Sequence, residues 1–267
     1  MFHLIRRITA IFKKIIIRAM DFVFPTVCPG CGKFIADGDA GEGKIVCGEC
    51  FEKIKYVDGK ICLKCGLPCP GDSCPGDLCD SCEKPRTEIY YTYLRGACVY
   101  NENLSGYISS FKYRGKEYLS EFLGNILNGY LEKHPEMTKV DAVVPVPLHW
   151  RKWLARGYNQ SELLSARVAK RFNIKLDSGM LERKRWTRPQ AKLTRQERFK
   201  NTDGAFEIKS GRQTAGKNIL LIDDVSTTGE TINQCAMALK NKGAGNVYGL
   251  VVARDLPERP APLDISH

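Results

Sequence analysis

The chain of 267 residues lacks any apolar stretch long enough to span a bilayer, so we expect no transmembrane helix. The first twenty residues also lack the uninterrupted apolar core of a secretory signal peptide, because Arg6, Arg7, Lys13, Lys14 and Arg18 interrupt it. A leader for export is therefore not predicted, and we expect the protein in the cytoplasm.

The same first 24 residues predict a basic amphipathic helix. Apolar residues recur there at helical spacing, and the basic residues lie mainly on the other side; the apolar set is Leu4, Ile5, Ile8, Ile11, Phe12, Ile15 and Ala19. Two interpretations stay open: a helix packed on its own protein, or a helix in peripheral contact with an anionic membrane. The net charge of +11 favours polyanionic partners, among them nucleic acid, nucleotides and membrane surfaces.

Cysteine is scarce outside one short region. Of the twelve cysteines, only Cys98 and Cys235 lie outside the segment from Cys28 to Cys82. Paired CxxC turns separated by fifteen residues, and then again by thirteen, are typical of four-cysteine zinc sites. The predicted ligands are Cys28, Cys31, Cys47 and Cys50 for a first site, and Cys62, Cys65, Cys79 and Cys82 for a second.

Closed four-cysteine sites leave no open coordination position, so one or two structural Zn²⁺ ions are expected. Residues 25–85 hold few large apolar side chains and would scarcely fold without the metal. Cys69 and Cys74 lie between the paired turns, where either could replace a ligand. Three roles stay open for this double zinc ribbon: a metal-stapled module only, a docking module for nucleic acid or protein, and a redox-active CxxC pair.

Residues 88–255 alternate in a strand–helix–strand pattern. Continuous apolar runs at 141–146, 217–223 and 246–253 predict strands covered on both faces, and helical periodicity marks 157–171 and 231–241. This alternation predicts an α/β domain with a parallel sheet. The Pro-rich segment 256–267 is predicted to be a disordered tail.

The segment Ile219–Thr231 carries most of the functional information. A buried strand ends in Asp223 and Asp224, at the edge where ligands of open α/β sheets bind. Small hydroxyl residues and a glycine then lead into a helix whose first N–H groups can hold a phosphate. Carboxylates beside a phosphate cradle suit a sugar phosphate, whereas an ordinary strand–turn–helix capped by Asp is the alternative.

This segment resembles the signature of type I phosphoribosyltransferases that binds 5-phosphoribosyl 1-diphosphate (PRPP). Further motifs resemble the ComF family of phosphoribosyltransferase-like competence proteins; they are the double zinc ribbon, Phe111-Lys112-Tyr113, Asp141–His149, Arg151–Gln160, and Arg185–Gln190 with Leu193, Arg198 and Asn201. The resemblance covers about residues 22–254. It implies a type I phosphoribosyltransferase-like fold, binding of PRPP with Mg²⁺, and handling of internalised single-stranded DNA in natural transformation with a partner helicase.

Site residues follow from the resemblance, position by position. Val144–Leu148 matches the loop that binds diphosphate, Arg151, Lys152 and Arg156 can neutralise its charge, and Arg185–Arg198 matches the loop that covers the ligand. The expected catalytic pair is Asp223 and Asp224. The expected phosphate-binding set is Val146, Pro147, Arg151, Arg156, Arg185, Val225, Ser226, Thr227, Thr228, Gly229 and Thr231.

Eight basic residues against one acid between Arg183 and Lys200 favour a polyanion, and Trp186 among them could stack on a base. A solvated basic face is the alternative. The sequence names no nucleophile, and the short segment after Val252 offers no base-recognition hood, which argues against ordinary nucleobase salvage. Three functions stay open: a DNA-uptake factor, a phosphoribosyltransferase with an unknown small acceptor, and a non-catalytic PRPP sensor.

Overall fold

The computed structural model describes residues 27–35, 45–69, 74–113, 115–184 and 204–256. They belong to two compact units, Met1–Lys53 and Ile54–His267. The predicted amphipathic lead, the residues after 256 and the basic loop from Arg185 lie outside the described residues. None of the helices within the described ranges combines the length and the apolar character that crossing a bilayer requires.

The first unit has little regular structure in its described part. One short helix, α2 (Gly48–Glu52), begins directly after Cys47, and an isolated bridge joins Val27 to Phe34. Lys33 and Glu49 form an exposed ion pair there, with 2.8 Å between the ammonium and the carboxylate oxygen. A segment with so few packed apolar side chains agrees with the expectation that metal holds it together.

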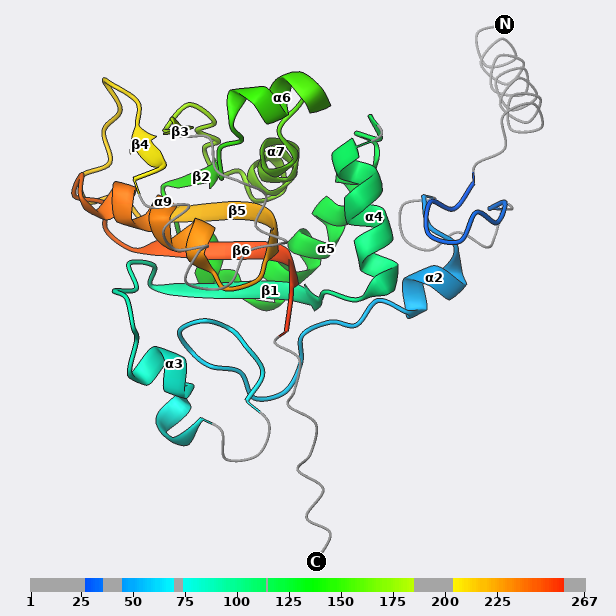
Figure 1. The fold of residues 1–267 in the computed structure, drawn as a ribbon, viewed down its shortest axis with the longest axis horizontal. Helices are drawn as coiled ribbons and strands as arrows, with labels where there is room; N and C mark the ends of the chain where they lie inside the picture. The colour runs from blue at the N-terminus through cyan, green and yellow to red at the C-terminus, as the bar shows by residue number, and fades with distance from the viewer. Residues whose placement is uncertain (1–26, 36–44, 70–73, 114, 185–203, 257–267) are drawn as a thin grey trace, which may run out of the picture. The chain divides into compact units, whose positions relative to one another are not determined.

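The second unit is built on a parallel sheet in the order β1, β6, β5, β2 (Figure 1). The strands are β1 (Tyr93–Val99), β2 (Ala142–Pro145), β5 (Ile219–Ser226) and β6 (Val247–Arg254), and every pairing among them is parallel. The parallel α/β sheet expected from the alternating pattern is therefore confirmed.

Helices cover both faces of this sheet, which explains its continuous apolar strands. On one face α5 (Leu119–Lys133) and α7 (Gln160–Phe172) pack against each other and against the strands. On the other, α9 (Glu230–Lys240) closes a core that includes Ile219 and Leu221, alternate residues of β5. The antiparallel pair of β3 (Leu181–Arg183) and β4 (Phe206–Ile208) packs against α9 through β4. The remaining described helices of the second unit are η1 (Pro75–Asp77), α3 (Asp80–Glu83), α4 (Glu102–Tyr113), η2 (Pro135–Thr138) and α6 (Trp150–Arg156).

Two element boundaries differ from the sequence-based expectation in ways that shape the site. Strand β5 continues past Asp223 to Ser226, because Val225 and Ser226 still pair with β6. Helix α7 begins at Gln160 rather than at Gly157, because Gly157 (φ 85°) ends α6. The Asn159 side chain then caps α7 by accepting a hydrogen bond from the backbone N–H of Ser161. The acid pair consequently lies within a strand.

The second cysteine-rich segment belongs to the second unit and lies along β1 (Figure 1). The backbone N–H of Leu94 donates to the carbonyl of Lys64 at 2.9 Å, and the Arg95 guanidinium donates to the carbonyl of Leu63 at 2.8 Å. Gly66 approaches so closely that a Cβ on it would lie 2.3 Å from the Leu94 carbonyl oxygen. The domain limits predicted at residues 85 and 88 stay predictions.

Candidate metal centres and ribose-phosphate site

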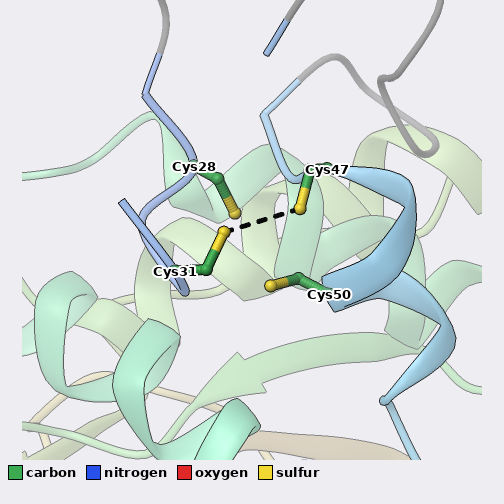
Figure 2. A group of neighbouring side chains, drawn as sticks. All are labelled: Cys28, Cys31, Cys47 and Cys50. Atoms are coloured by element: carbon green, nitrogen blue, oxygen red, sulfur yellow. Dashed lines mark hydrogen bonds between the residues drawn. The ribbon is translucent and has the colours of Figure 1, made fainter. Parts of the chain in front are cut away.

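The first group of cysteines gathers four sulfur atoms within the first unit. Figure 2 shows Cys28, Cys31, Cys47 and Cys50 pointing toward one another, with all Sγ atoms within 4.8 Å of each other. The Sγ atoms of Cys31 and Cys47 are 3.7 Å apart. A tetrahedral zinc ion with Zn–S bonds of about 2.3 Å spaces its sulfur ligands about 3.8 Å apart. The four donors therefore fit a structural zinc ion.

The second group, within the second unit, has the same geometry. Cys62, Cys65, Cys79 and Cys82 place their Sγ atoms within 4.8 Å of one another, and the Sγ atoms of Cys65 and Cys79 are 3.7 Å apart. The backbone N–H of Cys79 donates to the Cys62 sulfur at 3.4 Å. Both groups are those expected from the CxxC spacing, which confirms the zinc-ribbon part of the fold class.

Cys69 and Cys74 are joined to each other by a disulfide. Both are buried beside the second group. Disulfide sulfurs carry no thiolate charge to offer a metal ion. In this structure the two four-cysteine groups form without either residue, and the assignment of the metal ligands stays a prediction.

The acid pair at the end of β5 is held by residues from two helices. The Ser161 hydroxyl, in the first turn of α7, donates to Asp223 Oδ1 at 2.7 Å. The Lys112 ammonium, from the last turn of α4, lies 2.9 Å from Asp224 Oδ1. The Asp224 side chain is 9% exposed and that of Lys112 is 23% exposed. The two carboxylates therefore have fixed positions and different partners.

A cavity of about 180 Å³ opens beside the acid pair. Four basic residues reach it from three elements: Lys112 from α4, Lys152 and Arg156 from α6, and Arg183 from β3. The rest of its lining comes from the segment after β2, the start of α7, the acid pair and the start of α9; these residues are Val146, Pro147, Leu148, Asn159, Gln160, Ser161, Asp223, Asp224 and Thr231.

Charges in this cavity perturb one another. Burial and the nearby charges of Arg183 and Arg156 lower the pKa of Lys152 to about 8. Burial and the adjacent carboxylate of Asp224 raise the pKa of Asp223 to about 6. Four cations against two carboxylates leave a positive excess when all are ionised. A bound polyanion would relieve the repulsion among the cations.

A second hollow of about 60 Å³ lies in the turn between β5 and α9, and we call residues Val225–Thr231 the phosphate loop. Gly229 adopts φ 84° at the N-cap of α9, and the backbone N–H of Glu230 donates to the Thr228 hydroxyl oxygen at 3.4 Å. Thr231 lines both hollows, so they adjoin each other. The arrangement offers one place for an anion at a helix N-terminus and, next to it, carboxylates and cations.

Comparisons with known proteins agree with these two parts. The family model described as the double zinc ribbon domain matches residues 19–85, and the one described as the phosphoribosyl transferase domain matches residues 159–265. The chain is 31% identical over 218 residues, 78% of its length, to a protein of Bacillus subtilis named competence protein ComFC, and covers 84% of that protein. This chain belongs to the ComF family.

Two other relatives extend the comparison within the ComF family. Competence protein F of Haemophilus influenzae is 31% identical over 58% of this chain and 69% of its own length. DNA utilization protein YhgH of Escherichia coli K12 is 30% identical over 87% of this chain and 98% of its own length. The ComF resemblance inferred from separated motifs is therefore confirmed.

The structure brings most of the expected site residues of this ComF chain to the two hollows. Val146, Pro147 and Arg156 line the larger one, and the loop from Val225 to Thr231 lines the smaller. Arg151 is not among the lining residues: its guanidinium lies over the Trp150 ring, 5.2 Å from the ring centre. Arg185 lies outside the described residues. The roles of these residues stay predictions.

Sequence reasoning placed less weight on three residues that the fold brings into the cavity. Lys112 belongs to the motif Phe111-Lys112-Tyr113 and Arg183 begins the basic run, but neither is among the predicted site residues. Ser161 carries no signal of its own in the sequence. Only the meeting of α4, α7 and β3 around the end of β5 identifies them.

Proposed function

We propose that this chain binds PRPP, or a related ribose phosphate, across the two hollows. The 5-phosphate occupies the phosphate loop, the acid pair accepts hydrogen bonds from the ribose hydroxyls, and the cations beside Val146 and Pro147 receive the diphosphate. The observation that supports the proposal is the order along one short segment: the carboxylates of Asp223 and Asp224, then two more residues of β5, then the turn that leads into α9. Carboxylate oxygens also suit Mg²⁺, which would enter with PRPP and neutralise part of the diphosphate charge.

Calorimetry with PRPP and Mg²⁺ on the zinc-loaded chain tests this proposal. Asp223→Asn should weaken binding roughly tenfold to hundredfold, because hydrogen bonds to a charged acceptor contribute about 1.5–3 kcal/mol. Asp141→Asn is the matched control, since Asp141 lies at the opposite end of the sheet and accepts from the backbone N–H of Asn218 at 2.8 Å. An affinity unchanged by Asp223→Asn and by Asp223→Asn/Asp224→Asn together would refute the site.

We further propose that the protein acts in DNA uptake and natural transformation. The names of its relatives, competence protein and DNA utilization protein, support this role. In this role the chain handles single-stranded DNA in the cytoplasm, with a competence helicase as its partner and with peripheral membrane contact through the N-terminal lead. The net charge of +11 suits such a polyanion.

Binding of a fluorescent oligothymidine at several salt concentrations tests the DNA part. Arg185→Gln/Arg188→Gln should weaken binding and make the salt slope shallower by about 1.4, because each phosphate contact on a single strand contributes about 0.7. Lys184→Gln is the control with a smaller expected effect, since the Lys184 ammonium already pairs with Glu207 at 2.5 Å. Equal slopes for all three proteins would exclude a basic-loop contact.

A second candidate, phosphoribosyl transfer to an unknown small acceptor, is favoured by the four cations around the cavity. Lys112, Lys152, Arg156 and Arg183 surround a space where negative charge would develop on a departing diphosphate. Incubation with PRPP, Mg²⁺ and cell extract should then release diphosphate above the level of the Asp223→Asn variant. Tight PRPP binding without any release would instead favour a non-catalytic sensor.

A further inference from the structure

Arg254 is a fully buried cation at the end of β6, and it contacts the phosphate loop. Its Nη1 donates to the Ser226 hydroxyl at 2.7 Å and lies 3.4 Å from the Ser226 carbonyl oxygen. Gly96 on β1 leaves the space for this side chain, because a Cβ there would lie 2.2 Å from Arg254 Cγ. Its Nε is buried without a hydrogen-bond partner among the described residues. A buried charge with so few neutral partners requires a compensating charge.

The second cysteine group is one source of compensating charge. Arg254 interacts electrostatically with Cys65 and Cys82, and also with the Tyr91 hydroxyl and the neighbouring Asp255 carboxylate. A zinc ion held by four thiolates leaves a net charge of about −2, and this group is largely buried along β1. The guanidinium therefore interacts with two sites: electrostatically with the second cysteine group, and by a hydrogen bond with the Ser226 hydroxyl.

A second contact runs between the same two sites through residues at the start of β1. The ammonium of Lys64, which lies between Cys62 and Cys65, is 5.9 Å from the centre of the buried Tyr91 ring, and the Tyr91 hydroxyl would lie 3.4 Å from a Cβ on Gly229 in the phosphate loop. Leu94 has its carbonyl against Gly66 of the ribbon and its side chain against Gly229. Two packed connections thus join the second cysteine group to the turn that begins α9.

We propose that zinc in the second centre and ribose phosphate in the phosphate loop are thermodynamically coupled, with Arg254 as the positioning residue between them. The proposal rests on the phosphate loop binding a ribose phosphate, as proposed above. The zinc thiolates hold the guanidinium, the guanidinium holds Ser226, and the loop keeps its open shape. Coupling is reciprocal. Loss of zinc therefore lowers the affinity for the sugar phosphate, and the bound sugar phosphate raises the affinity for zinc by the same factor, which slows zinc release.

Calorimetry with ribose 5-phosphate, which probes the loop without the diphosphate subsite, tests this coupling on the full chain. Cys82→Ser, which weakens the second centre, should lower affinity roughly tenfold, a typical coupling between sites. Cys31→Ser weakens the first centre in the same way and should leave affinity unchanged. Arg254→Met should lower affinity by the amount seen for Cys82→Ser, and the two changes together should cost no more than either alone.

Further variants separate positioning from general stability. Arg254→Lys should restore part of the affinity, because it keeps the charge and one donor. Arg95→Met removes another arginine that contacts the same ribbon through Leu63 but does not reach the loop, and it should keep wild-type affinity. In the wild-type protein, ribose 5-phosphate should slow zinc release to a chromogenic chelator, and only from the second centre. This last measurement needs no variant and holds even if Arg254→Met does not fold.

The outcomes separate the coupling from the proposed function. If the zinc-loaded wild type binds neither ribose 5-phosphate nor PRPP, both ideas are wrong. Binding that is insensitive to Cys82→Ser, or effects of Cys82→Ser and Arg254→Met that simply add, would overturn the coupling and leave the ribose-phosphate site standing.

Discussion

The ion pair between Lys112 and Asp224 gives the sharpest single prediction for stability. The ammonium and the carboxylate oxygen are 2.9 Å apart, with the two side chains 23% and 9% exposed. At an effective dielectric constant near 20, this separation corresponds to about 6 kcal/mol of attraction before desolvation is subtracted. Removing one member of a buried pair typically costs about 3–5 kcal/mol. Since Lys112 is partly exposed, we expect Lys112→Met to lower the free energy of unfolding by about 2–3 kcal/mol.

A double-mutant cycle with Asp224→Asn measures the pair itself. Urea unfolding of the zinc-loaded chain, followed by circular dichroism, should give a coupling energy of about 1–3 kcal/mol. Lys184→Met is the control, because Lys184 and Glu207 form an exposed pair, 54% and 53% exposed, whose attraction is screened by solvent and contributes little to stability. If Lys112→Met costs no more than Lys184→Met, the attribution of stability to this pair is wrong.

The pH dependence of the same pair follows from the direction of its pKa shift. Burial alone would lower the pKa of Lys112, but attraction to Asp224 outweighs burial and the pKa is raised. A raised lysine pKa means that the stabilisation is complete below the unfolded value of about 10.4 and disappears as the pH rises through the folded value. Because Lys112 stays protonated at both pH values, Lys112→Met should lower the free energy of unfolding by the same amount at pH 7 and at pH 9.

Two further predictions concern the cavity and the ribbon. PRPP affinity, measured by calorimetry from pH 5 to pH 9, should rise as Asp223 ionises near pH 6 and fall as Lys152 loses its proton near pH 8. The variant Lys152→Met should lack the fall in affinity at alkaline pH. A wild-type affinity that does not change with pH would contradict both assignments. Gly66→Ala should lower the free energy of unfolding by about 2–4 kcal/mol, because Gly66 has φ 70° and lies against Leu94. Gly59→Ala, at φ 73° with open space around it, should cost only about 1–2 kcal/mol, and equal losses would argue against the close approach.

The sequence by itself determined the features that depend on neighbours along the chain. Cysteine pairs with two residues between their members, and with fifteen or thirteen residues between the pairs, predicted the two cysteine groups that the structure assembles. Four consecutive apolar residues followed by Asp223 and Asp224 predicted β5 and the turn into α9. These patterns are legible because a CxxC turn and a strand–turn–helix unit are local, and their side-chain periodicity is set by the backbone alone.

Only the tertiary structure decided which distant side chains meet at the site. Lys112 reaches Asp224 and Ser161 reaches Asp223 across separations of 112 and 62 positions. The contact of Arg254 with Ser226 depends on the pairing of β6 with β5, and no local pattern marks a buried arginine in advance. Such meetings follow from strand order and helix packing, where burial of the whole core outweighs any local preference. The chain thus encodes the two cysteine groups and the turn from β5 into α9 locally, and the cations around the acid pair only through the fold.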